Sequence, residues 1–240
     1  TPSQNLVDAY EMIDGTPFDW NNPEHKSNPY ANRDPRLAMS ILTNNVEFKD
    51  RTIEAWTGGR DGKGVIHATR TGYYIYKFID PNLDLLQNRT SVHHWVIMRY
   101  AEILLSYAEA MNEAYGPTGN VGYRLNAVRA LNQVRNRVGV EMPAVPTAIS
   151  KEELREKIRN ERRVELAFED HRFWDVRRWM IAPETLGAPL RGVEITKISD
   201  EEFEYKPIEV EKRTFEPKMY LYPIPQADLN TTGWVQNPLW

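Results

Sequence analysis

Three glutamates in the stretch RNERRVELAFEDHRFWDVRRW, residues 159–179, are spaced so that they could carry out chemistry. Glu161, Glu165 and Glu169 follow one another at intervals of four, which places them on one face of a helix. Paired carboxylates serve as acid and base in glycoside hydrolysis. With His171 nearby, the same carboxylates could instead hold a metal ion. The stretch therefore raises two chemical hypotheses, a glycosidase and a metal site.

The same charges also fit a structural interpretation, an ion-pair ladder. Arg162 lies three residues before Glu165, and Lys157 lies four before Glu161, spacings at which helical side chains meet. Arginine can stack on an aromatic ring while its fork reaches a carboxylate, so the neighbouring rings fit this interpretation too. They are Phe168, Phe173, Trp174 and Trp179. We favour the ladder, which fixes this helix against its neighbours, and predict no catalytic residue, no metal ligand and no cofactor.

Composition excludes several other functions. The 240 residues contain no cysteine, which removes disulfides, thiolate zinc sites and cysteine nucleophiles. With 30 basic and 34 acidic residues the net charge is −4, so nothing indicates a nucleic-acid partner. No stretch approaches the roughly 20 apolar residues that a membrane span needs.

The elements that must position the charged stretch change in character at about residue 96. Residues 1–95 are rich in Pro, Asn, Asp and Gly, which favours turns, and one strand is expected in TGYYIYKFID, residues 71–80. Apolar residues then recur at spacings of three and four up to Met111, which predicts a helix that ends at Gly116. A second stripe from Val121 to Val138 predicts a second helix, and so an antiparallel helical hairpin of tetratricopeptide type.

A third helix is expected to begin at Ser150. The residues SKEE form a capping box, in which Ser150 accepts from the amide of Glu153 and Glu153 reaches back. This helix should continue into the charged stretch. After Trp179 the sequence is rich in turn residues, with at most a short helix, and the last forty residues predict strand and loop.

The charged stretch resembles the hallmark of the starch-utilisation SusD/RagB family of outer-membrane nutrient-binding lipoproteins. Other segments resemble the family in the same order along nearly the whole chain. They are LVDAYEMIDG, NRDPRLAMSIL, TGYYIYKF, RYAEILLSYAEAMNE, AVRALNQVRNRVGV, YLYPIPQADLN and QNPLW. Because the order is preserved, we regard the resemblance as specific.

The resemblance implies a mainly α fold of the SusD type: a tetratricopeptide-type helical hairpin and packed helices, with a loop-rich region and a few short strands. The match corresponds to about the second half of a family member. We therefore expect residues 1–240 to be the C-terminal portion of a SusD/RagB-like domain. Residues 1–95 would be a loop-rich ligand-binding part, 96–180 a helical scaffold, and 181–240 a strand and loop part. The signal sequence, the lipid-bearing cysteine and most helical repeats would lie upstream, so the chain should be a fragment.

The resemblance also implies a function. Family members capture oligosaccharides or other nutrients at the cell surface and act as a lid on a SusC-type TonB-dependent transporter in the outer membrane. They carry out no catalysis, and a lipid anchor attaches them to the membrane. Two alternatives stay open from the residues themselves: a helical-repeat module that binds only protein, and a glycoside hydrolase that uses Glu161 and Glu165.

Aromatic residues in the loops of residues 16–74 are the expected sugar contacts. A pyranose presents an apolar face that stacks on a ring, while polar side chains bond its hydroxyls. Trp56 is the first candidate platform, with a role in the loop core as its alternative. Arg60 and Asp61 could bond hydroxyls or be ordinary turn residues. Trp20 and Tyr30 could contact ligand or simply hold the proline-rich loop.

Overall fold

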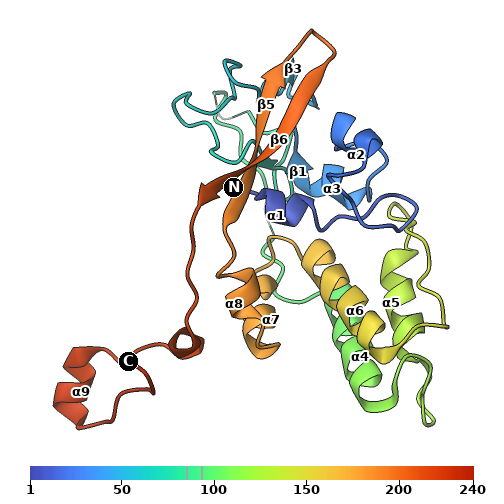
Figure 1. The fold of residues 1–240 in the computed structure, drawn as a ribbon, viewed down its shortest axis with the longest axis vertical. Coiled ribbons are helices and arrows are strands. Elements are labelled where there is room, and N and C mark those ends of the chain that lie inside the picture. Colours follow the sequence, from blue (N-terminus) through green and yellow to red (C-terminus); the bar gives the residue numbers. More distant parts are fainter. Residues whose placement is uncertain (85, 93) are drawn as a thin grey trace.

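The computed structural model of the chain describes residues 1–84, 86–92 and 94–240. The long helices lie together at one end of the molecule, and the two longest strands form a hairpin at the other end (Figure 1). These helices are α4 (Tyr100–Tyr115), α5 (Ala127–Arg135) and α6 (Lys151–Glu165), and the strands are β5 (Leu190–Lys197) and β6 (Phe203–Glu211). Within the described ranges, every helix is too short or too polar to cross a lipid bilayer.

Apolar residues of α4, α5 and α6 form the first hydrophobic cluster. α4 packs against both of the other helices, so the expected helical hairpin and third helix are confirmed as a packed group. Spacings of three and four place the buried residues of each helix on one side. The buried members include Leu104, Leu105, Ala108, Val128, Leu131, Val134, Leu154 and Ile158.

Both helices of the hairpin are shorter than the apolar spacing predicts. α4 begins at Tyr100, three residues after the first expected position, and it ends at Gly116, whose φ of +75° suits glycine. α5 begins only at Ala127, because the side chain of Asn126 caps it, and Val138 lies beyond its end with 93% of its surface exposed. Spacing alone does not separate helical residues from apolar residues in the adjoining loops.

The charged stretch is not one continuous helix. α6 carries the expected capping box at Ser150 and Glu153, but it ends at Glu165. Phe168 and Asp170 then adopt positive φ values of 65° and 63°, and α7 (His171–Arg178) starts in a new direction. The prediction that Glu169 shares a helix face with the other two glutamates was therefore wrong.

Among residues 1–84, 86–92, 94 and 95, the chain is loop-rich, as expected, with helices and strands of only two to five residues. The strand expected over residues 71–80 is reduced to β4, which pairs antiparallel with β1. The elements of this part are α1 (Gln4–Val7), α2 (Pro23–Ser27), α3 (Arg36–Ser40), β1 (Ile41–Leu42), β2 (Glu47–Phe48), β3 (Arg51–Thr52) and β4 (Tyr74–Ile75).

The β5–β6 hairpin packs on this loop-rich part and completes the second hydrophobic cluster. The amide of Val193 on β5 donates to the carbonyl oxygen of Thr71 at 2.9 Å. Gly72 makes this approach possible, because its φ is +84° and a Cβ there would lie 2.7 Å from Cγ1 of Val193. The buried residues of the cluster include Val7, Tyr10, Ile41, Tyr73, Val193, Ile195 and Tyr205.

The C-terminal residues leave this body as an extended arm (Figure 1). The short helix expected after Trp179 is α8 (Ala182–Thr185). The arm contains a 3₁₀ turn, η1 (Pro217–Tyr220), and a helix, α9 (Gln226–Thr232), which the prediction of strand and loop over the last forty residues did not include. Proline at residue 225 is the N-cap of α9, a position where its missing N–H costs nothing.

The capping box of α6 provides a stability test. We expect Ser150→Ala to lower the free energy of unfolding by about 1 kcal/mol, because Ser150 Oγ accepts from the amide of Glu153 at 3.1 Å. Urea denaturation followed by circular dichroism measures this change. Ser199→Ala, in an exposed bend, is the matched control and should change stability little. An equal effect of both substitutions would contradict the capping role.

Candidate functional site

Glu161 on α6 is buried, with 2% of its surface exposed, and two arginines from other segments hold its carboxylate. Arg36 in α3 donates to one oxygen through Nη1. Arg135 at the end of α5 donates to the other oxygen at 2.8 Å, and it also reaches Glu11 at 2.9 Å. One carboxylate therefore joins the loop-rich part to the helical cluster.

Glu165, one turn further along α6, is surrounded even more completely. Arg36 lies 2.9 Å away, and Arg99 and Arg137 each donate to it at 2.6 Å. Arg99 also bonds both oxygens of Glu169, at 2.7 and 2.9 Å. Glu169 lies beyond the C-terminal end of α6 but belongs to the same ion network.

The ladder interpretation was correct in kind and wrong in its pairs. Lys157 donates to Glu11 at 2.8 Å instead of meeting Glu161. Arg162 bonds Asp175 on α7 at 2.8 Å instead of Glu165. The partners thus come from other segments of the chain, because α6 is buried on the face that carries its glutamates.

The arginines around Glu165 favour its ionised form. Burial alone would raise the pKa of Glu165, but hydrogen bonds from Arg99 and Arg36 outweigh it and lower the pKa to about 2. A carboxyl group with so low a pKa is a poor general acid near neutral pH. His171 lies 3.6 Å from Glu102. In the part of the chain that the structure describes, no three His, Asp or Glu side chains converge as a metal site would require.

Arginine stacking accounts for two of the rings in the charged stretch. The guanidinium of Arg177 lies 4.3 Å from the ring centroid of Phe173. Arg159 and Arg178 lie 5.1 and 4.7 Å from the ring of Trp179. Trp174 differs, because 63% of its surface is exposed.

Trp56 is half-buried in the loop after β3, beside the tip of the β5–β6 hairpin. Its ring centroid lies 5.4 Å from that of Phe203, with an angle of 34° between the planes. Nζ of Lys197 lies 5.0 Å from the same ring. Trp56 therefore belongs to the margin of the second cluster and keeps part of its surface exposed.

Arg60 and Asp61 are engaged in their own loop. The carboxylate of Asp61 accepts two hydrogen bonds from Arg51, at 2.6 and 2.7 Å, and one from the amide of Glu54 at 2.9 Å. The bonds from Arg51 lower the pKa of Asp61. Arg60 pairs with Glu54 at 3.2 Å and is exposed. A ligand would have to share these groups with existing partners.

Trp20 and Tyr30 lie on either side of α2. The indole N–H of Trp20 donates to Asp8 at 3.0 Å, which ties the proline-rich loop to α1. The ring of Tyr30 packs edge-on against Tyr205 at 5.3 Å, and its hydroxyl lies 3.3 Å from that of Tyr73. Burial of this hydroxyl raises the pKa of Tyr30.

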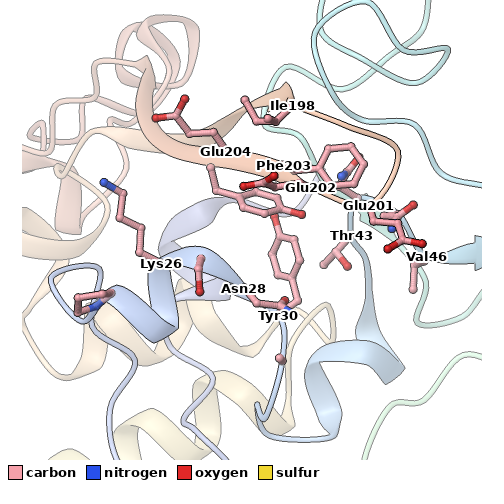
Figure 2. A pocket seen from close by; sticks show the side chains of 16 residues that line it. Lys26, Asn28, Tyr30, Thr43, Val46, Ile198, Glu201, Glu202, Phe203 and Glu204 are labelled. Atoms are coloured by element: carbon pink, nitrogen blue, oxygen red, sulfur yellow. The ribbon is translucent and has the colours of Figure 1, made fainter.

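A groove of about 880 Å³ opens between the α2 loop and the hairpin. Figure 2 shows Tyr30 and Asn28 from the loop on one side, with Phe203 and its acidic neighbours on the hairpin across from them. Its walls combine rings with amides, hydroxyls and carboxylates, a lining that suits a polar ligand with apolar faces. The polar and aromatic lining residues are Lys26, Ser27, Asn28, Tyr30, Thr43, Asn44, Asn45, Glu201, Glu202, Phe203, Glu204 and Tyr205.

A continuous row of rings connects this groove to Trp56. Phe203 and Tyr205 alternate along β6, so both point to one face of the hairpin, with their ring centroids 6.4 Å apart. Trp56 contacts Phe203 at one end of the row, and Tyr30 contacts Tyr205 at the other. Two of the predicted residues, Trp56 and Tyr30, are therefore brought to one aromatic surface.

Sequence reasoning missed the hairpin's contribution to the groove. It placed ligand contacts in residues 16–74, whereas Phe203 and Tyr205 come from the other end of the chain. The alternation of rings and charges in FEYK, residues 203–206, was the available signal for a strand with one aromatic face. Nothing in that pattern indicates which loop the face would meet.

The chain was compared with known proteins. It is 34% identical over 120 residues to SusD-like protein P2 of Formosa agariphila, a match that covers 48% of this chain and 22% of that protein. A SusD-like protein from Bacteroides fragilis has a similar structure, with a TM-score of 0.77 and 32% identity over the whole of this chain and 47% of the other. A second B. fragilis structure, described as a SusD-like carbohydrate binding protein, has a TM-score of 0.75 and 30% identity, covering 96% of this chain and 47% of the other.

These similarities define the fold as SusD-like, mainly helical with few and short strands. The model of the SusD family matches residues 1–240, and the chain belongs to this family. It spans about a fifth of the length of the curated relative and less than half the length of each of the two solved structures.

The ion network around Glu165 predicts a large loss of stability from a single substitution. We expect Glu165→Gln to lower the free energy of unfolding by about 3–5 kcal/mol, because Arg36, Arg99 and Arg137 would all lose this carboxylate. Chemical denaturation measures the loss. Glu152→Gln, exposed on the same helix, is the matched control and should change stability by less than about 0.5 kcal/mol. A loss no larger than that of the control would contradict the bracing role.

The same carboxylate predicts an acid transition. The pKa of Glu165 falls from 4.5 to about 2 on folding, so its contribution is fully present above pH 4.5 and is lost as the pH falls toward 2. We expect the urea concentration at the unfolding midpoint to decrease as the pH is lowered through that window. The midpoint of the Glu165→Gln variant should decrease less. Titration series of the two proteins measure the difference. Parallel curves would refute the assignment.

Proposed function

We propose that this chain is the C-terminal portion of a cell-surface protein that binds oligosaccharides for delivery to a SusC-type TonB-dependent transporter in the outer membrane. Membrane attachment would be through a lipid anchor on the full-length protein. Membership of the SusD family supports the proposal. So does the similarity to a structure described as a carbohydrate binding protein.

The groove beside the hairpin is the observation that carries this proposal. Rings such as Tyr30 and Phe203 offer flat apolar surfaces, and Asn28 and Asn45 offer both donors and acceptors within the same groove. A pyranose has an apolar face and a rim of hydroxyls, so it can use both kinds of group at once. We extend the site along the row of rings to Trp56, and we keep Arg60, Asp61 and Trp20 as proposed ligand contacts.

The proposal assigns no catalytic role to this chain. The hydrolase alternative would use Glu161 and Glu165, and guanidinium groups already occupy both carboxylates. The low pKa of Glu165 removes the proton that a general acid must donate. We assign Glu161 and Glu165 a structural role.

We assign the α4–α5 hairpin to a tetratricopeptide-type repeat and keep the division into a loop-rich part, a helical scaffold and a strand and loop part. Tyr100 and Ile103 on α4 are 70% and 47% exposed, which favours contact with a further protein surface. A protein-interaction module without sugar binding is therefore the second candidate function. Co-purification with a transporter and no measurable affinity for sugars would favour it.

A glycan titration tests the first candidate. We expect calorimetry with a panel of polysaccharide fragments and the full-length protein to find a ligand. Trp56→Ala should weaken its binding about three- to tenfold, the value of one stacked ring. Trp174→Ala removes an exposed tryptophan outside the groove and is the matched control. Thermal melts show whether each variant is folded.

The outcomes of this titration separate the hypotheses. Equal affinity of the wild-type protein and Trp56→Ala would reject Trp56 as a platform. No binding across the panel would reject the proposed function, and release of cleaved products by the wild-type protein would favour the hydrolase instead.

A further inference from the structure

A second cavity, of about 590 Å³, lies at the other end of the β5–β6 hairpin from the groove. It is bordered by α1, the end of α6, the start of α7, α8 and the start of β5. Four arginines line it: Arg163, Arg172, Arg191 and Arg213. Arg191 and Ile198 in the groove are seven positions apart along the hairpin, which at about 3.3 Å a position is roughly 23 Å.

Two of these arginines lack the partners that a half-buried guanidinium normally has. Arg163 donates through Nη2 to the carbonyl oxygen of Asn5 and to no carboxylate among the described residues. Arg172 is half-buried and, over residues 1–84, 86–92 and 94–240, makes neither a hydrogen bond nor an ion pair. The negative charge of Asp175 stabilises the Arg172 cation only through a longer-range electrostatic interaction.

Other buried arginines of the same protein show the contrast. Arg36 bonds three carboxylates, those of Asp34, Glu161 and Glu165. Arg33 bonds no carboxylate within the described part of the chain but donates three hydrogen bonds to backbone carbonyl oxygens. Burying a cation without such partners is costly. Arg163 and Arg172 are therefore exceptions that call for a partner from outside the chain.

The electrostatics of the cavity agree with this geometry. Burial and the neighbouring charge of Arg172 lower the pKa of Arg163 to about 10, and burial lowers that of Arg172 as well. Two carboxylates line the cavity. Asp8 already accepts hydrogen bonds from Gln4, Trp20 and Arg191, and Glu184 is exposed. The four guanidinium groups outnumber these acids, so the cavity has an excess of positive charge.

We infer that this cavity binds an oxoanion, a sulfate or carboxylate substituent of an acidic saccharide, between Arg163 and Arg172. The planar fork of arginine matches such groups with paired hydrogen bonds. Asn5, Asn160 and Thr185 also line the cavity and can bond sugar hydroxyls. The saccharide part of the inference rests on the proposed function, whereas the anion part rests on the arginines alone.

Calorimetry at low ionic strength tests the inference with four titrants: glucose 6-sulfate, glucuronate, inorganic sulfate and glucose. We expect the full-length protein to bind glucose 6-sulfate or glucuronate more tightly than inorganic sulfate. Glucose, which has no anionic group, should not bind in this cavity. Arg172→Gln should weaken binding of the acidic sugar about tenfold or more, the value of a hydrogen bond to a charged group. Arg163→Gln should weaken it as well. Arg124→Gln, an exposed arginine between α4 and α5, is the matched control and should leave binding unchanged.

A melting experiment gives an independent readout. Without ligand, Arg172→Gln should melt about 2–4 °C higher than the wild-type protein, because it removes an unpaired charge from a half-buried position. At the same concentration, acidic sugar should raise the midpoint of the wild-type protein more than that of the variant.

Three results would overturn the inference. Absence of binding by both acidic sugars and inorganic sulfate would remove the site. Unchanged binding in Arg172→Gln and Arg163→Gln would place the anion elsewhere. Inorganic sulfate binding as tightly as the acidic sugars would make it a site for a free anion and not for a saccharide. Each result is independent of the groove, whose neutral glycan binding depends on Trp56 and not on Arg172.

Discussion

The carboxylates of Glu161 and Glu165 inside the protein are the constraint on which the rest of the structure depends. Their guanidinium partners come from α3, from the segment before α4, and from the end of α5 and the residues after it. Once α6 packs in the helical cluster, these ions leave water, and each must then find its partner or the fold is penalised. Arg36 lies in the loop-rich part and Arg135 in the helical part. The same ion pairs therefore fix the positions of the two hydrophobic clusters relative to each other. Arginine suits this task because its rigid fork serves two carboxylates at once.

The walls of the groove are held by contacts outside this ion network. Arg33 fixes the loop on one side of the groove by donating to the carbonyl oxygens of Val7, Tyr10 and Pro29. The hydrogen bond from the amide of Val193 to Thr71 fixes the hairpin on the other side. The ring of Tyr30 is thus presented by a short loop, and those of Tyr205 and Phe203 by strand β6, on a fixed base. A preorganised surface of this kind loses little conformational entropy when a ligand stacks on it.

Charge is used in two opposite ways in this chain. At Glu161 and Glu165 of α6 each carboxylate is matched by guanidinium groups, which favours a single arrangement. In the cavity beside α1 the guanidinium groups of Arg163 and Arg172 are half-buried, and no carboxylate of the described residues bonds them. The first arrangement stabilises the free protein. The second leaves free energy that a bound anion can recover, which is how a binding site differs from a brace built of the same residues.

Local sequence determined the elements whose cause is local. The capping box at Ser150, the stop at Gly116 and the apolar stripes of α4 and α6 depend on neighbours within four residues, and the structure contains all of them. The ordered motifs likewise determined the family. The structure alone decided the partners of Glu161 and Glu165, the break at Phe168 and the meeting of Tyr30 with Tyr205. These contacts join residues far apart along the chain, and a helix or strand period states which face a side chain occupies but not which distant segment will cover it.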